Sequence, residues 1–189
     1  MTAPEHEDIL DMLKRRYAGP IMNNVSRGDY VECMIASALG ADWRLTWMDG
    51  WDWAAWDCEH APSHARLEIK QAAARQTWDK GPPPPRRTPA FDIAPRSGYW
   101  TREGEWIDTP GRHADVYVFA WHGSDDNHAD HTDPRQWRFF VVAERDLPQA
   151  QKSIGLKRLT AIAVPCGIPD LRRQVEMACP AQRELKVNS

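Results

Sequence analysis

The sequence lacks the features that define several large classes of protein. Its four cysteines are scattered and form no C-x-x-C pair, which argues against a zinc site built from cysteines alone and fits reduced thiols in a cytosolic setting. No apolar run approaches the length needed to span a bilayer. Residues 1–16 are acidic and then amphipathic, unlike a signal peptide. We therefore expect a cytoplasmic protein with no membrane partner.

The chain also lacks an excess of positive charge. Its net charge is −3, which does not by itself indicate a nucleic-acid binder. The basic residues are unevenly placed, however, and two groups of them could contact phosphates or could be ordinary solvated surface. The first group is Arg86, Arg87, Arg96, Arg102 and Arg112, and the second is Lys152, Lys157 and Arg158.

Tryptophan is abundant. Six of the ten tryptophans fall between Trp43 and Trp78. Large aromatic side chains mostly fill cores and fix sheet edges, and a base-stacking platform is the alternative use. The length of 189 residues and the hydrophobic content of 42% predict one domain, residues 1–189, with a core of its own.

Hydrophobic spacing predicts helices mixed with strands. A capping-box spacing at Ser26 and Asp29 marks the start of the second helix, and Gly40 marks its end. The predicted helices cover 5–17, 26–40 and 169–178, with a short helical turn at 73–78 and a further element at 153–159. The predicted strands cover 45–48, 53–59, 66–72, 114–121 and 137–143, of which the last two suit a central sheet. This order predicts an α/β fold.

Residues 79–113 are predicted to be a proline- and arginine-containing loop region within the domain. Four consecutive prolines at 82–85 are incompatible with a helix interior or a central strand, and they favour extended polyproline geometry. The segment could follow a duplex, bind a partner or lie on the surface.

The most informative stretch is residues 53–71, WAAWDCEHAPSHARLEIKQ. Alternate residues of a strand point to the same face, so Glu68 and Lys70 project together while Ile69 points into the core. If the two segments pair as a hairpin, Asp57 can meet them. Two carboxylates favour a hard divalent cation, and a neighbouring lysine can stabilise a phosphate or an attacking water. A solvated strand face with a weak salt bridge is the structural alternative.

The choice of the first acid depends on the hairpin register. Asp49, Asp52 and Glu59 lie nearby, and Asp52 could replace Asp57 because a slip of one residue exchanges the two faces of a strand. We favour Asp57, which is nearer the turn and pairs more easily with Glu68.

These residues resemble the PD-(D/E)XK, or restriction endonuclease-like, nuclease superfamily. Asp57 matches the spaced acid of the family, and residues 68–70 match its E-x-K tripeptide. Gln71 matches the polar residue that often follows, and Glu32 is placed for the glutamate that a preceding helix often contributes. Trp56 stands where the family often has proline. The likeness covers about residues 32–71, and two further blocks resemble an uncharacterised bacterial group without implying anything more about activity.

The resemblance implies a restriction-endonuclease-like mixed central sheet flanked by helices. It also implies a Mg²⁺-dependent endodeoxyribonuclease, a hydrolase that cuts phosphodiester bonds of DNA, and Mn²⁺ is a substitute metal. Asp57, Glu68, the carbonyl of Ile69 and Glu32 would hold metal. Defence against foreign DNA is one role that such a site serves.

The resemblance further implies roles for the remaining polar residues. Lys70 would lie near the attacking water, and Gln71 would orient that water or the lysine. A homodimer and a protein partner from the same system are left open. A catalytically inactive DNA- or partner-binding module of the same fold is the alternative function.

A second candidate site lies between the last two predicted strands, in residues 122–133. It contains seven side chains of types that bind metal, but it shows no H-E-x-x-H or similar spacing. A hydrophilic connecting loop is the simpler interpretation. The seven are His122, Asp125, Asp126, His128, Asp130, His131 and Asp133.

Overall fold

A computed structural model describes residues 5–79 and 88–180. A five-stranded mixed sheet lies at their centre, in the order β1-β2-β3-β7-β8, and only β3 and β7 are parallel. Its strands are β1 (Trp43–Leu45), β2 (Cys58–His60), β3 (Arg66–Ala73), β7 (Val116–His122) and β8 (Trp137–Ala143). The expected α/β fold around a mixed sheet is confirmed.

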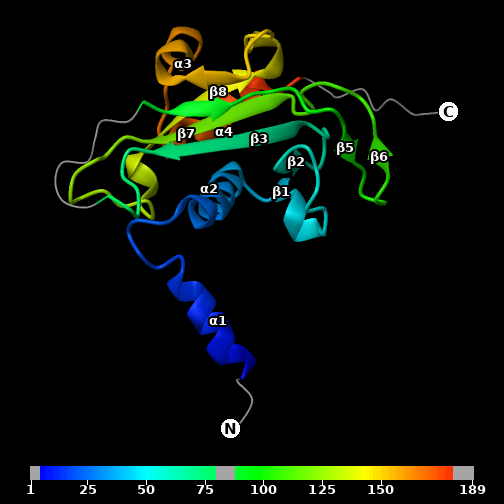
Figure 1. The fold of residues 1–189 in the computed structure, drawn as a ribbon. Coiled ribbons are helices and arrows are strands. Elements are labelled where there is room, and N and C mark those ends of the chain that lie inside the picture. The colour runs from blue at the N-terminus through cyan, green and yellow to red at the C-terminus, as the bar shows by residue number, and fades with distance from the viewer. Residues whose placement is uncertain (1–4, 80–87, 181–189) are drawn as a thin grey trace.

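The two faces of the sheet are covered by different elements (Figure 1). Helices α2 (Asn24–Leu39) and α4 (Ile168–Ala178) pack on one face, where Val31 and Leu171 meet Leu67. Helix α3 (Leu156–Ile162) covers the other face with a small sheet of β4 (Ala90–Asp92) and β9 (Ser153–Gly155). Burial on both faces explains why β7 is an almost unbroken apolar run.

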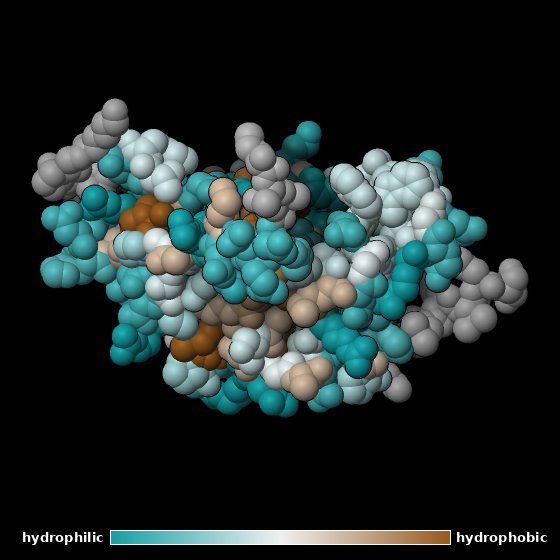
Figure 2. All heavy atoms as spheres, turned by 90° about the horizontal axis from the view of Figure 1, so that it is seen from below, coloured by the Kyte–Doolittle hydropathy of each residue, from teal (hydrophilic) through white to brown (hydrophobic). Residues whose placement is uncertain are grey.

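The N-terminal helix stands apart from this body. Helix α1 (His6–Arg15) has no buried residue, and Figure 1 shows it projecting away from the sheet on the side of α2. The prediction of a helix over 5–17 is confirmed. Seen from below, the surface is mostly hydrophilic, with scattered hydrophobic residues (Figure 2). None of the helices in 5–79 and 88–180 is long and apolar enough to cross a membrane.

The start of α2 differs from the prediction. Asn23 caps the helix, and its side chain accepts hydrogen bonds from the main-chain N–H groups of Val25 and Ser26. Ser26 is therefore inside the helix, where its hydroxyl accepts a hydrogen bond from Arg16, and the predicted capping box is wrong. The end at Gly40, which has a φ of 95°, is confirmed.

The predicted hairpin is confirmed, although its first arm is short. Strands β2 and β3 are antiparallel, with Cys58 opposite Leu67. Residues 53–57 are not a strand, because Trp56 turns into the opposite core. Residues 46–48 belong to a 3-10 helix (Thr46–Asp49) that ends at Gly50, and residues 74–78 form bends and a turn rather than a helical turn.

The region 79–113 contains more regular structure than the sequence suggested. The prolines at 82–85 and the following two arginines lie outside the described residues, so the prediction for them stays a prediction. Downstream, β4 pairs with β9, and β5 (Tyr99–Trp100) pairs with β6 (Trp106–Ile107). The guanidinium of Arg112 is buried, where it donates to the carbonyls of Ile93 and Pro148. A strand partner 61 to 65 residues away could not be inferred from local spacing.

The C-terminal elements follow the prediction in part. Residues 153–159 divide into β9 and the start of α3, while α4 carries Pro169 in its first turn as expected.

Candidate active site

The hairpin register brings Asp57 to the edge of β3. Its main-chain N–H donates to the carbonyl of Leu67 at 2.9 Å, and its carboxylate Oδ2 accepts the N–H of Ile69 at 2.6 Å. β2 does not pair with β3 at Ile69, so it offers no main-chain acceptor to the Ile69 N–H there. The Asp57 carboxylate accepts this hydrogen bond instead. Because the N–H and C=O of one strand residue leave the same edge, the Ile69 carbonyl also faces the Asp57 side.

Glu68 and Lys70 form an ion pair on one face of β3, between Lys70 Nζ and Glu68 Oε1. Their side chains are only 11% and 22% exposed, so little water screens the pair. Ile69 lies on the opposite face, in the core with α2. The prediction that the two charged side chains project together is confirmed.

Glu32 comes to this cluster from α2. Trp47 Nε1 donates to its Oε2 at 3.0 Å. Burial raises the pKa of Glu32, and the charges of Asp29 and Glu68 raise it further, while the Trp47 hydrogen bond and Lys70 act in the opposite direction. The pKa of Glu32 thus responds to the charges on β3, and its predicted role in holding metal stays a prediction.

Burial and neighbouring charges shift the pKa values of Asp57 and Lys70. Burial raises the pKa of Asp57 well above its ordinary value, and the carboxylates of Glu68 and Glu32 add to the rise, against Lys70 and the Ile69 N–H. Burial alone would lower the pKa of Lys70, but Glu68 and Asp57 outweigh it and the net pKa is raised. Lys70 therefore stays charged, and Glu68 and Asp57 are the acids that raise its pKa.

This donor set fits a hard divalent cation. Within 5–79 and 88–180, no group of three or more histidine, cysteine, aspartate or glutamate side chains is already arranged around one point. The carboxylates of Asp57 and Glu68 and the carbonyl of Ile69 are oxygen donors of the kind that hard divalent cations take. Burial is the main cause of the raised pKa of Asp57, and a cation there would offset both the burial of its charge and the repulsion from Glu68 and Glu32 that adds to the rise.

Gln71 points to the other face of β3. Its Nε2 donates to the carbonyl of Asn24 at 3.1 Å, and its Oε1 accepts from Arg27 Nε at 2.6 Å. These contacts join β3 to the first turn of α2, and its predicted role toward water or Lys70 stays a prediction.

The alternative acids lie elsewhere. Asp52 is exposed in the segment before β2. Asp49 pairs with Arg102 at 3.7 Å, and Glu59 contacts His64 at 3.1 Å. Asp57, by contrast, contacts the E-x-K segment through the Ile69 N–H, as the favoured register requires.

Two residues beside the site were not identified as site residues from the sequence. Asp92, in β4, binds Arg96 at 2.9 Å, and both charges act on Lys70. Arg96 had been noted only as part of a basic group. Asp92 gave no signal, because β4 reaches β3 through a long-range packing contact.

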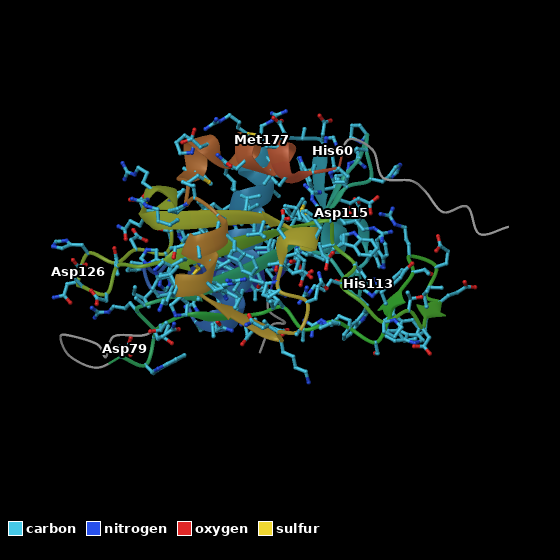
Figure 3. All side chains as sticks on the ribbon, turned by 90° about the horizontal axis from the view of Figure 1, so that it is seen from above. His60, Asp79, His113, Asp115, Asp126 and Met177 are labelled. Carbon is cyan, nitrogen blue, oxygen red and sulfur yellow. The ribbon has the colours of Figure 1, made fainter. Side chains whose placement is uncertain are left out.

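The residues of the loop 122–133 are used differently. His122 and His131 are fully buried, with ring centroids 4.9 Å apart. His131 Nδ1 accepts the N–H of Met22, and burial lowers the pKa of His131 to about 3. Asp130 binds Thr132, and Asp126 lies at the far end of the molecule from His113 and Asp115 (Figure 3). This loop includes no metal-ligating group of three or more.

The tryptophans divide between core and surface. Trp43, Trp56 and Trp137 are buried. Those with large exposed areas are Trp47, Trp53, Trp78, Trp100 and Trp106. Core filling therefore accounts for only part of the excess.

Comparisons of the chain with protein-family models, with curated proteins and with solved structures found no match.

Proposed function

We propose that the protein is a metal-dependent DNA endonuclease that hydrolyses phosphodiester bonds. The observation that carries the proposal is the hairpin register, which puts the Asp57 carboxylate on the Ile69 N–H beside the buried Glu68–Lys70 pair. A mixed sheet with helices on both faces also supports a restriction-endonuclease-like fold.

The residues suit the chemistry of phosphodiester hydrolysis. Asp57, Glu68 and the Ile69 carbonyl would hold Mg²⁺, with Glu32 at the margin. When bound, Mg²⁺ lowers the pKa of a bound water and offsets phosphate charge. The ammonium of Lys70 stabilises the negative charge that grows on the phosphate oxygens during attack. Its low exposure strengthens this interaction, because a less hydrated charge acts through a lower effective dielectric.

Glu32 supplies a further carboxylate at the margin of the site. In this proposal it holds an outer water or a second cation, and Trp47 fixes its orientation. The pKa values of Asp57 and Glu32 are raised, chiefly by burial, and a bound cation would favour their ionised forms, so activity should depend on added metal.

A plasmid-nicking assay tests the proposal. Wild type, Lys70→Ala and Lys14→Ala are incubated with supercoiled plasmid and Mg²⁺ or Mn²⁺, with and without a chelator. Lys14 is an exposed lysine on α1, outside both basic groups, and serves as the matched control. We expect metal-dependent nicking by wild type and Lys14→Ala, and a loss of about 100-fold or more in Lys70→Ala. Undiminished cutting by Lys70→Ala would overturn the assignment.

The second candidate is an inactive DNA- or partner-binding module of the same fold. It is favoured by one observation, the direct contact of Lys70 with Glu68, which occupies a carboxylate oxygen that a metal would need. Calorimetry with Mg²⁺ and Mn²⁺ separates the two, because an inactive module would bind neither ion at the carboxylates. Defence against foreign DNA, a homodimer and a partner protein belong to the proposal and are tested only once a substrate is found.

A further inference from the structure

A cavity of about 480 Å³ lies on the same face of the sheet as the Glu68–Lys70 pair. Its floor is a row of residues across three strands, because Arg44 is opposite Glu59 and Glu59 is opposite Arg66. Tyr99 in β5 and Arg102 in the turn after β5 close it. Figure 3 shows His113, whose ring contacts Tyr99 in a tilted arrangement, at the end of the molecule that carries the β5–β6 hairpin.

This floor is one row away from the candidate active site. Alternate residues of a strand share a face, so Arg66 and Glu68, both in β3, face the same way. Two residues along a strand cover about 7 Å. A nucleic-acid strand with a phosphate at Glu68 and Lys70 would therefore bring an adjoining nucleotide to the cavity.

The charges around the cavity are nearly balanced. Its arginines face the acids Asp49, Glu59 and Glu103, and two of these acids are already engaged, Asp49 by Arg102 and Glu59 by His64. A balanced lining is a poor trap for a bare phosphate. It offers both donors and acceptors, which is what the edge of a nucleobase requires.

Aromatic rings form part of the wall. Trp51 and Tyr99 line the cavity, and both pack against the buried Trp56, at centroid distances of 4.7 and 5.7 Å. The Arg102 guanidinium lies 5.5 Å from the Trp51 ring. Aromatic rings and guanidinium planes are the surfaces on which unpaired bases stack, and the volume falls in the range of ordinary ligand pockets, about 300–1,000 Å³.

We infer that this cavity holds one unpaired nucleobase of the strand bound at the active site, stacked against Trp51 or Tyr99. The inference rests on the proposed function for the identity of the ligand, and it adds a base-recognition site to a phosphate-cutting one.

The test compares strands with and without bases. Fluorescence anisotropy, in the presence of a chelator, measures the affinity for a labelled single strand of about 12 nucleotides and for an abasic strand of the same length. We expect wild type to bind the base-containing strand about tenfold more tightly, the effect of a stacked base. A ratio near one, with both DNA and RNA strands, would overturn the inference.

A cavity-filling variant locates the effect. Ala61 is exposed and lines the cavity, so Ala61→Trp should fill it and bring the ratio close to one. Ala150→Trp makes the same change at an exposed alanine elsewhere and should keep the wild-type ratio. An unchanged ratio in Ala61→Trp would place base stacking elsewhere and overturn the inference. Arg44→Ala, which removes an exposed floor residue, gives a second measurement and should lower the ratio at least about threefold.

The two proposals can fail separately. Because binding is measured without metal, a base-dependent ratio with no plasmid nicking would reject the nuclease and retain the cavity. Metal-dependent nicking with a ratio of one would reject the cavity alone.

Discussion

The hairpin of β2 and β3 and the loop 122–133 are both rich in side chains that bind metals, and the fold uses them in opposite ways. In the hairpin, Asp57 and Glu68 are brought together by strand register and repel each other. In the loop, His131 accepts a main-chain N–H and Asp130 binds Thr132. The loop has more candidate ligands, but in the hairpin the strand register puts the Asp57 carboxylate on β3, next to the Glu68–Lys70 pair. The proposal therefore rests on register and not on the number of candidate ligands.

The same contrast predicts opposite responses to pH. A buried acid with a raised pKa stabilises the folded state as pH falls, because the folded state keeps the proton. A buried histidine with a lowered pKa does the reverse. Each of the following changes tests either the acids at the hairpin or the residues of the loop 122–133.

The largest effect is expected from Glu68→Gln. Neutralising this carboxylate removes a metal donor and the partner of Lys70, so cleavage should fall by about 100-fold or more. The paired loop change Asp126→Asn with His128→Ala should alter cleavage by less than about twofold. Plasmid nicking measures both. Equal losses of cleavage in the two variants would contradict the proposal that the hairpin, and not the loop, carries the active site.

Acidification should weaken the histidine side of the comparison. The pKa of His131 is lowered to about 3 in the folded state, so the unfolded chain binds more protons between that value and about 6.5. Its contribution to stability is complete above about pH 6.5 and is lost as pH falls toward 3.

The expected loss from pH 7 to pH 5 is about 2 kcal/mol. Urea unfolding of wild type and His131→Gln at both pH values measures it. The variant should show a smaller difference, and an equal difference in the two proteins would contradict the assignment to His131.

Neutralising Asp57 should stabilise the metal-free protein. The folded-state pKa of Asp57 lies above its unfolded value, so its contribution to stability falls as pH rises through the interval between them. Asp57→Asn removes this penalty and keeps an acceptor for the Ile69 N–H. At pH 8 without metal, its melting temperature should exceed that of wild type by about 2–4 °C for each 1 kcal/mol gained. A lower melting temperature at pH 8, measured by calorimetry, is the result that this account does not allow.

The smallest effect is expected from Trp47→Phe. The change removes the N–H that stabilises the ionised form of Glu32, so the pKa of Glu32 should rise further. The acidic limb of the pH–rate profile should move to higher pH, with a loss of about threefold near neutral pH. An unshifted limb would remove Glu32 from the site.

The local sequence pattern was sufficient to predict how the residues at the centre of the candidate site are arranged. The alternation of Leu67, Glu68, Ile69 and Lys70 correctly predicts which side chains share a face, and the turn at 61–63 correctly predicts the hairpin. The buried runs in β7 and β8 were also found, since two covered faces leave an unbroken apolar signal.

Long-range packing accounts for most of what local pattern missed. The pairing of β4 with β9 joins segments that share no local signal, so Asp92 could not be placed beside Lys70. Gln71 fits the motif by spacing, but the N-terminal turn of α2 engages both ends of its amide. The burial of His122 and His131 was equally hidden in a polar loop.

Calorimetric titration with Mn²⁺ tests the central claim most directly, because it needs no knowledge of the substrate. Wild type, Asp57→Asn and the loop variant Asp126→Asn with His128→Ala are compared at neutral pH. The account predicts divalent-ion binding that Asp57→Asn loses and the loop variant keeps. Binding retained in Asp57→Asn, or lost in the loop variant, would contradict a metal site at the hairpin.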